Sequence, residues 1–234
     1  MKKIGIIIFA VALVIGLVVS NMFSFGRTNE RFFKFEFNFG SVRGNGNAAT
    51  DKRDLAGFKS VEVGGTFDVE ITAQKDFSVT VEADDNLIPL IRTEVSGGTL
   101  HIEADKRLSS KNPIRVRISA PDIEKLDVSG VANVTVADLK NSALSIGSSG
   151  ASKVKLAGET GKLTVDVSGA TKIDAAELKT IDAVIDSSGA SHVDVNVSGE
   201  LRADGSGASK ITYVGTPSNI VKKTSGASNV SQKN

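Results

Sequence analysis

The chain has no cysteine and no tryptophan, only four prolines and a single tyrosine. Without cysteine it can form no disulfide, no thiolate zinc or iron–sulfur site, no cysteine nucleophile and no lipid anchor on cysteine. It also lacks an excess of either charge, since 28 Lys and Arg stand against 27 Asp and Glu, a formal net charge of +1. This balance argues against a dedicated nucleic-acid binder. We expect no cofactor and no nucleic-acid partner.

Aromatic residues are missing from most of the chain. All 11 Phe lie at or before Phe77, and Tyr213 is the one aromatic residue after it. Hydrophobic residues still make up 40% of the 234 residues, which is enough for a packed core. The sequence therefore divides into a first part that contains Phe and a second part whose core is aliphatic.

Residues 1–25 predict a signal peptide or a transmembrane anchor. Two lysines precede an unbroken apolar run over residues 4–19, which further apolar residues extend to Phe25. The length fits a cleaved signal peptide, or a bilayer-spanning helix with its N-terminus in the cytoplasm. We favour the retained anchor, because Val18-Val19-Ser20 is a weak cleavage site; a buried helix of the fold is the alternative. Either form of export segment places the rest of the protein on the non-cytoplasmic side of the cell envelope, with the membrane as a partner.

Residues 26–57 are predicted to be a stalk or linker. Phe alternates with polar residues over 31–39, a period typical of a half-buried strand. Such a strand would either contact the membrane interface or a partner, or cap an open end of the domain. The stretch from Ser41 to Asp54 is rich in Gly, Asn and charge, which suggests a flexible tether.

The second part of the chain is a repeat. Six Ser-Gly pairs recur at intervals of 18 to 20 residues, and Ala follows the Gly in five of them. The glycines are Gly130, Gly150, Gly169, Gly189, Gly207 and Gly226. Apolar residues within each unit alternate at period two, which is strand spacing. A period of about 20 residues built from strands predicts a β-helix, in which each unit is one coil stacked on the last at about 4.8 Å.

The fold class that follows is all-β: a parallel β-helix of 19–20-residue coils over 126–234. Residues 58–125 carry alternating strands without a period, and we expect them to cap the coils, with their Phe residues as capping bulk. Gly64-Gly65 is interpreted as a hairpin-like break. Asp84-Asp85-Asn86 could hold calcium, but its spacing lacks the EF-hand pattern, so a turn is the preferred interpretation.

The Ser-Gly-Ala motif is best explained as a structural corner of each coil. Glycine permits positive φ or close backbone approach, and stacked serine hydroxyls can hydrogen-bond along the column. A catalytic role for the serines is the alternative, but no histidine recurs with them to act as a base.

Polar columns flank the corner and are the candidate ligand contacts. Three residues after successive glycines stand Lys153, Lys172, His192 and Lys210, between Asn133 and Asn229. Three residues before the glycines stand Asp127, Asp166, Asp186 and Asp204, in a row that Gly147 interrupts. Three interpretations follow: solvated faces that keep the protein soluble, columns that pair across the corner, or ladders that bind a metal or a repeating polymer such as an anionic glycan.

The ordered motifs resemble the putative auto-transporter adhesin, head GIN domain family of bacteria. The resemblance rests on residues 65–71, 81–87 and 97–102 followed by the Ser-Gly repeats, and it spans roughly residues 58–214. It implies a right-handed β-helix-like fold on a secreted or envelope protein, and it brings no catalytic residues.

Three functions remain open from the sequence. The first is a non-enzymatic cell-envelope module, adhesive or structural, that binds a glycan or an envelope protein. The second is a sensor of envelope stress, and the third is a polysaccharide lyase or hydrolase. The enzyme is disfavoured because active sites usually interrupt a regular repeat and because few aromatic residues are available to stack on sugars. The open edges of the last coil also suggest pairing with another copy of the chain.

Overall fold

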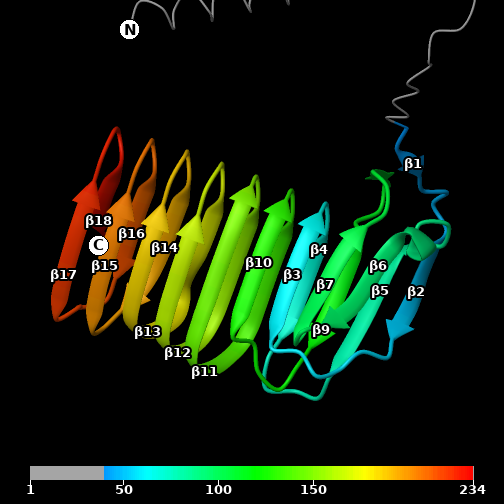
Figure 1. The fold of residues 1–234 in the computed structure, drawn as a ribbon, viewed down its shortest axis with the longest axis horizontal. Helices are drawn as coiled ribbons and strands as arrows, with labels where there is room; N and C mark the ends of the chain where they lie inside the picture. The colour runs from blue at the N-terminus through cyan, green and yellow to red at the C-terminus, as the bar shows by residue number, and fades with distance from the viewer. Residues whose placement is uncertain (1–39, 234) are drawn as a thin grey trace, which may run out of the picture. The chain divides into compact units, whose positions relative to one another are not determined.

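The computed structural model describes residues 40–233, which are almost entirely β-structure. The elements are β1 (Val42–Arg43), β2 (Ala48–Arg53), β3 (Ser60–Gly65), β4 (Asp68–Thr72), β5 (Ser78–Asp84), the 3₁₀-helix η1 (Ile88–Leu90), β6 (Ile91–Ser96), β7 (Thr99–Ala104), β8 (Leu108–Ser109), β9 (Arg115–Ser119), β10 (Lys125–Gly130), β11 (Asn133–Gly150), β12 (Lys153–Val167), β13 (Lys172–Ser187), β14 (His192–Val197), β15 (Glu200–Gly205), β16 (Lys210–Val214), β17 (Asn219–Thr224) and β18 (Asn229–Gln232). The β-solenoid expected from the repeat is present (Figure 1).

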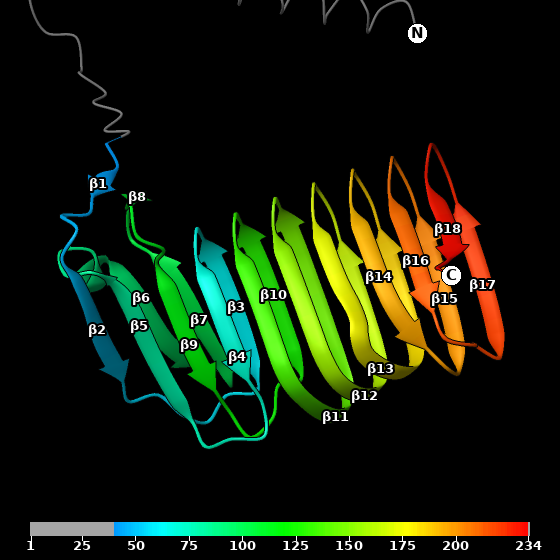
Figure 2. The ribbon, with the colours of Figure 1, turned by 180° about the vertical axis from the view of Figure 1, so that it is seen from behind.

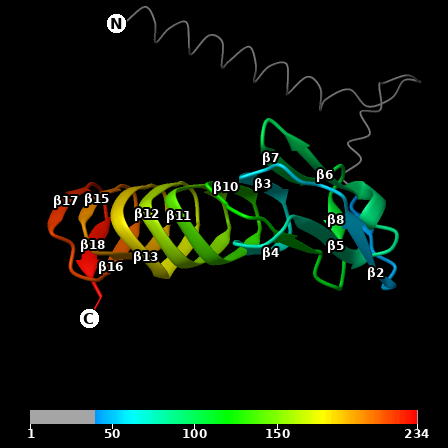
Figure 3. The same ribbon diagram turned by 90° about the horizontal axis from the view of Figure 1, so that it is seen from below.

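The strands form two faces that lie back to back, as Figures 1 and 2 show from opposite sides. Face A consists of β6, β7, β3, β10, the C-terminal halves of β11, β12 and β13, then β15 and β17. Face B consists of β2, β5, β9, β4, the N-terminal halves of β11, β12 and β13, then β14, β16 and β18. The long strands β11, β12 and β13 bend from one face to the other, so each coil closes around a narrow interior (Figure 3).

Neighbouring coils pair in parallel and in register along the repeat. Val134 lies opposite Val154 and Ile146 opposite Val165, so the apolar side chains of one coil stack on those of the next. These side chains are almost fully buried. The two-residue alternation of the sequence therefore becomes a dry aliphatic core with polar residues outside, which is why the repeat contains no Phe.

The N-terminal end of the solenoid contains the aromatic residues. Phe58 is fully buried, and its ring lies 5.0 Å from that of Phe77, centroid to centroid. Here the pairing changes, because β6, β5 and β2 join their neighbours antiparallel. Larger side chains fit at this end, where the interior widens beyond the regular coils.

Gly64-Gly65 is not a hairpin break. Strands β3 and β4 do not pair with each other; they lie on opposite faces, and β3 aligns with β10 so that Gly65 stands opposite Gly130. The pair is therefore one more corner of the solenoid. Sequence reasoning missed it because Ser is replaced by Gly and the spacing to the next corner is far longer than 20 residues.

The segment expected to be a flexible tether is partly built into the fold. Strand β2 pairs antiparallel with β5, and β1 pairs with β8. The predicted anchor over residues 1–25 and the Phe-rich strand over 31–39 lie outside the described residues. Within residues 40–233, no helix has the length and apolar character needed to cross a membrane.

Candidate functional site

The six repeat glycines stand in one column at the corner between face A and face B. All have positive φ, from +70° to +106°. The backbone closes up along this column: the amide of Ala151 donates to the carbonyl of Gly130 at 2.9 Å, and the amide of Ala170 donates to that of Gly150 at 2.8 Å. A Cβ on Gly150 would lie 2.5 Å from the Gly130 oxygen. Glycine is required here by both conformation and space.

A column of hydroxyls lies inside the corner, two residues after five of the six glycines; its first four members are buried and the last is partly exposed. Its members are Ser152, Thr171, Ser191, Ser209 and Ser228. Ser152 bonds to Ser148 at 2.6 Å, and Ser191 bonds to Ser187 at the same distance. Sequence reasoning missed this column, although a Ser or Thr at a fixed offset from five glycines was the available signal. These hydroxyls are packed in the interior, so they support the corner and do not reach a substrate.

The predicted candidate contacts form one continuous column on face B. Lys153 lies opposite Lys172, Lys172 opposite His192, and His192 opposite Lys210. We call these four residues the lysine ladder. The three lysines are exposed, and no ion pair among residues 40–233 includes any of them. Asn229 follows Lys210 at one end of the column, and at the other end Asn133 separates Lys153 from Asp68.

His192 differs from the lysines because a buried carboxylate holds it. Its Nε2 lies 3.0 Å from Oδ2 of Asp194, whose other oxygen accepts a hydrogen bond from the Thr212 hydroxyl. Burial raises the pKa of Asp194, but the Thr212 bond and the nearby His192 outweigh it, so the pKa is lowered overall. Asp194 therefore stays ionised and fixes the imidazole. His192 is thus fixed by a carboxylate, whereas Lys172 and Lys210 on either side of it are exposed.

Some other lysines near the repeats have a carboxylate partner, whereas Lys140 and Lys162 take part in no ion pair within residues 40–233. Lys155, in the next column of face B, lies 2.8 Å from Glu177, and Lys179 lies 3.1 Å from Glu159. The pKa of Lys155 is raised by its hydrogen bond to Glu177. Lys153, Lys172 and Lys210 therefore differ from Lys155, which lies in the next column of face B and is paired with Glu177.

The predicted acidic column lies on face A, on the far side of the corner. Asp166 stands opposite Asp186, and Asp186 opposite Asp204. We call Asp127, Asp166, Asp186 and Asp204 the acidic stripe. Within the described part of the chain, no ion pair joins this stripe to the lysine ladder. The interpretation in which the two columns pair across the corner is wrong. The lysine ladder lies on face B and the acidic stripe on face A, so their side chains point away from each other.

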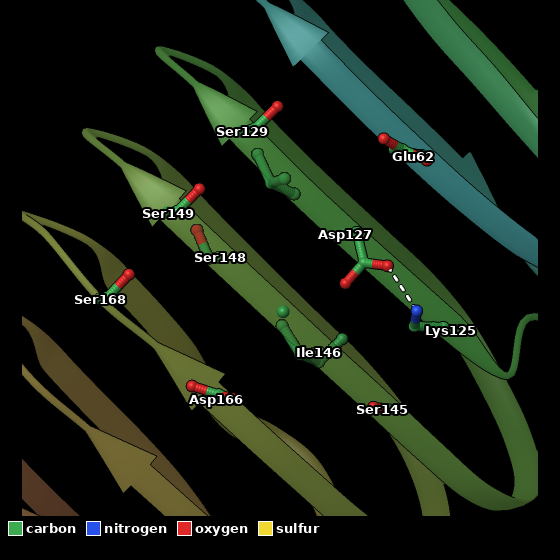
Figure 4. A pocket seen from close by; sticks show the side chains of 12 residues that line it. Glu62, Lys125, Asp127, Ser129, Ser145, Ile146, Ser148, Ser149, Asp166 and Ser168 are labelled. Atoms are coloured by element: carbon green, nitrogen blue, oxygen red, sulfur yellow. Dashed lines mark ion pairs between the residues drawn. The ribbon is translucent and has the colours of Figure 1, made fainter.

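A shallow hollow interrupts the acidic stripe at Gly147 (Figure 4). Gly147 stands opposite Asp127 on one side and Asp166 on the other. The hollow is lined by both carboxylates and by hydroxyls that include those of Ser129 and Ser149. A Cβ on Gly147 would overlap the carboxylate of Asp127, which Lys125 also contacts at 2.7 Å. The missing side chain therefore creates a small polar recess between two carboxylates.

The described acidic and histidine side chains contact local partners. No group of three His, Asp or Glu side chains in residues 40–233 is placed to hold a metal ion. Asp84 accepts hydrogen bonds from Ser110 and Asn112, both at 2.9 Å, so it serves as a clasp, and residues 84–87 form the turn preferred above. Both histidines contact carboxylates, His101 contacting Glu62 and His192 contacting Asp194. Neither is placed as the base of a corner serine.

Solved structures with this fold include two putative adhesins. A putative adhesin from Bacteroides fragilis NCTC 9343 aligns with a TM-score of 0.68 and 19% identity, over 82% of this chain and 100% of its own. A putative adhesin from Parabacteroides merdae ATCC 43184 aligns with a TM-score of 0.51 and 17% identity, over 83% of this chain and 99% of its own. Identities this low show the fold alone. A comparison with curated proteins found no match.

A family model settles the relationship. The model described as "Putative auto-transporter adhesin, head GIN domain" matches residues 57–217, which cover the solenoid up to the end of β16. This range includes five of the six corner glycines, all but Gly226, together with the lysine ladder and the acidic stripe. The chain belongs to the auto-transporter adhesin, head GIN domain family.

Proposed function

We propose that this protein is a non-enzymatic binding module of the bacterial cell envelope, and that the lysine ladder is its contact surface for an anionic partner. The observation that carries the proposal is the exposed, unpaired column of Lys153, Lys172 and Lys210 on face B. Membership of an adhesin-like family supports a location at the envelope or cell surface, and agrees with the export segment predicted at the N-terminus.

The ladder is electrostatically unfavourable unless something occupies it. Stacked strands set equivalent side chains about 4.8 Å apart. Two unit charges at about 4 Å repel by roughly 1 kcal/mol in water. Neighbouring carboxylates would remove this cost, as Glu177 does for Lys155. Within residues 40–233, His192 has such a partner in Asp194, but the three ladder lysines have none. An anionic partner would supply the missing compensation.

The energy available sets the kind of partner. Exposed ion pairs contribute about 0.2–1 kcal/mol each, so three lysines give roughly 3 kcal/mol at most. A single contact is therefore no tighter than the millimolar range, which corresponds to about 4 kcal/mol. A repeated or surface-bound anion gains from multivalency, which raises avidity by about 10²–10⁴. A linear polymer or a dense array suits the ladder; a small free anion does not.

The architecture also argues against an enzyme. The ladder and the acidic stripe continue with one residue per coil, whereas a catalytic group requires different residue types converging on one point. The hollow at Gly147 is shallow and open (Figure 4). Its carboxylates, Asp127 and Asp166, stand on separate coils with Gly147 between them, and Lys125 already contacts Asp127.

Binding to a polyuronate tests the proposal. Wild-type protein is titrated onto immobilised polygalacturonate at low salt, beside a variant with Lys153, Lys172 and Lys210 changed to Glu. A control variant carries Glu at three dispersed, exposed lysines, and thus has the same net charge: Lys106, Lys140 and Lys162.

We expect the wild type and the control to bind and the ladder variant to lose at least tenfold in apparent affinity. Binding should also weaken as salt rises from 20 to 300 mM, because exposed charges are screened. Equal losses in the two triple variants would show that only net charge matters and would refute the ladder as a site.

A further inference from the structure

We infer that a second copy of this chain is a partner for the lysine ladder, and that the acidic stripe of that copy docks on it face to face. This inference rests on the proposed function, because it names the anionic partner of the same surface. The contact would join face B of one copy to face A of the next. Each copy keeps one free face, so the contact is heterologous and can continue from copy to copy.

The two surfaces carry opposite charges at the same spacing. Both columns advance by one residue per coil, and the coils that carry them are shared, so the rise along both is the same. Lys153 and Lys172 are successive rungs on face B, and Asp166 and Asp186 are successive rungs on face A. Within residues 40–233, none of these four residues takes part in an ion pair, whereas Asp127 at the end of the stripe is paired with Lys125. The net charge of +1 means that two whole copies have little overall repulsion to overcome.

The hollow at Gly147 offers a specific seat within this contact. It leaves an opening between the carboxylates of Asp127 and Asp166, and the hydroxyls of Ser129 and Ser149 line its rim (Figure 4). A lysine ammonium needs up to three acceptors. The carboxylate of Asp166 and the serine hydroxyls supply them, beside Asp127, which Lys125 already contacts. A lysine of the neighbouring ladder can end there, so the gap in the acidic stripe would fix the register of the two copies.

The size of the surface predicts a weak contact. Face B is about 29 Å long over six strands, β11 to β14, β16 and β18, and about 17 Å wide over five residues. Two such faces would bury about 1,000 Å², the lower end for a specific interface. We therefore expect association between surfaces crowded with copies, where multivalency applies, and little association in dilute solution.

Charge exchange between the two faces tests the inference. The full chain, kept in non-ionic detergent, is coupled at high density to uncharged beads through a C-terminal tag, and bead clustering is counted by microscopy. One variant carries Lys153→Glu, Lys172→Glu and Lys210→Glu, so both of its faces are acidic. The other carries Asp166→Lys, Asp186→Lys and Asp204→Lys, so both of its faces are basic.

We expect wild-type beads to cluster, beads of either variant alone to stay dispersed, and a mixture of the two variants to cluster again. Salt at 300 mM should disperse the clusters, and soluble polygalacturonate should compete with them. Circular dichroism establishes that both variants fold; if either fails, the single changes Lys172→Glu and Asp186→Lys replace the triple changes in the same design.

Dispersed wild-type beads, or variants that cluster as well as the wild type, would overturn the inference. So would a mixture that fails to cluster when the wild type does. Wild-type beads that bind polygalacturonate but do not cluster would overturn this inference and leave the proposed function standing. Beads that do neither would overturn both.

Discussion

Replacing Gly150 by alanine tests the claim that the corner column is required by geometry. Gly150 has φ of +106°, and a Cβ there would lie 2.5 Å from the carbonyl oxygen and 3.0 Å from the amide nitrogen of Gly130. A side chain in such a backbone conformation costs about 1–3 kcal/mol. Forcing the stacked coils apart adds a further cost of about 1–3 kcal/mol, as overpacking does in cores.

We therefore expect Gly150→Ala to lower the free energy of unfolding by about 2–6 kcal/mol, measured by urea denaturation followed by circular dichroism. Two control variants separate the contributions. Gly46 has φ of +88° with no atom within 4 Å of the added Cβ, so Gly46→Ala measures the cost of the backbone conformation alone. Gly161 lacks a positive φ, but its Cβ would lie 2.6 Å from the Ser142 oxygen, so Gly161→Ala measures the cost of steric overlap alone.

The expected order is that Gly150→Ala is more destabilising than either control. A loss at Gly150 no larger than that at Gly46 would show that the coils yield easily, and the close packing of the corner would no longer explain the glycine column. A change in the denaturant slope would point instead to loss of cooperative unfolding between coils.

Two further predictions concern buried polar groups. Ser209 is 2% exposed and its hydroxyl has no partner among the described residues, because Gly205 stands where Ser187 supplies one in the preceding coil. The change Gly205→Ser should therefore raise the free energy of unfolding by about 0.5–1.5 kcal/mol. Unchanged or lower stability would contradict the hydroxyl column. Hydrogen bonds from Asn112 and Ser110 lower the pKa of Asp84 below its ordinary value of 3.8. The stability that the ionised Asp84 contributes is therefore present above that pH and lost as pH falls below it. In acid denaturation, the free energy of unfolding of wild type should drop more steeply than that of Asp84→Ala, and parallel curves would refute the clasp.

The repeated part of the fold could be predicted from sequence because every coil states the same rule. Alternating residues such as Val154 and Leu156 indicate strand, the glycine interval fixes the coil, and stacking then places Lys153 beside Lys172 without further information. The same regularity predicts the acidic stripe as a column of one residue per coil. That it lies on the opposite face from the lysine ladder is shown by the structure.

Features that occur once and do not repeat from coil to coil could not be predicted from the sequence. The corner at Gly64-Gly65 was hidden because β5 to β9 are inserted before the chain returns beside it as β10. The hollow at Gly147 is an omission, visible only when Asp127 and Asp166 are seen on either side of it. The strand β2 looked like a tether because its pairing with β5 depends on a partner 30 residues away.

The most direct test of the central claim is to read the contact from wild-type protein. Lysines are acetylated with a limiting reagent, with and without bound polygalacturonate, and each site is quantified by mass spectrometry. If the ladder is the contact surface, Lys153, Lys172 and Lys210 lose reactivity by several-fold on binding while Lys106 and Lys140 do not change. Binding that leaves the three ladder lysines as reactive as before would contradict the account.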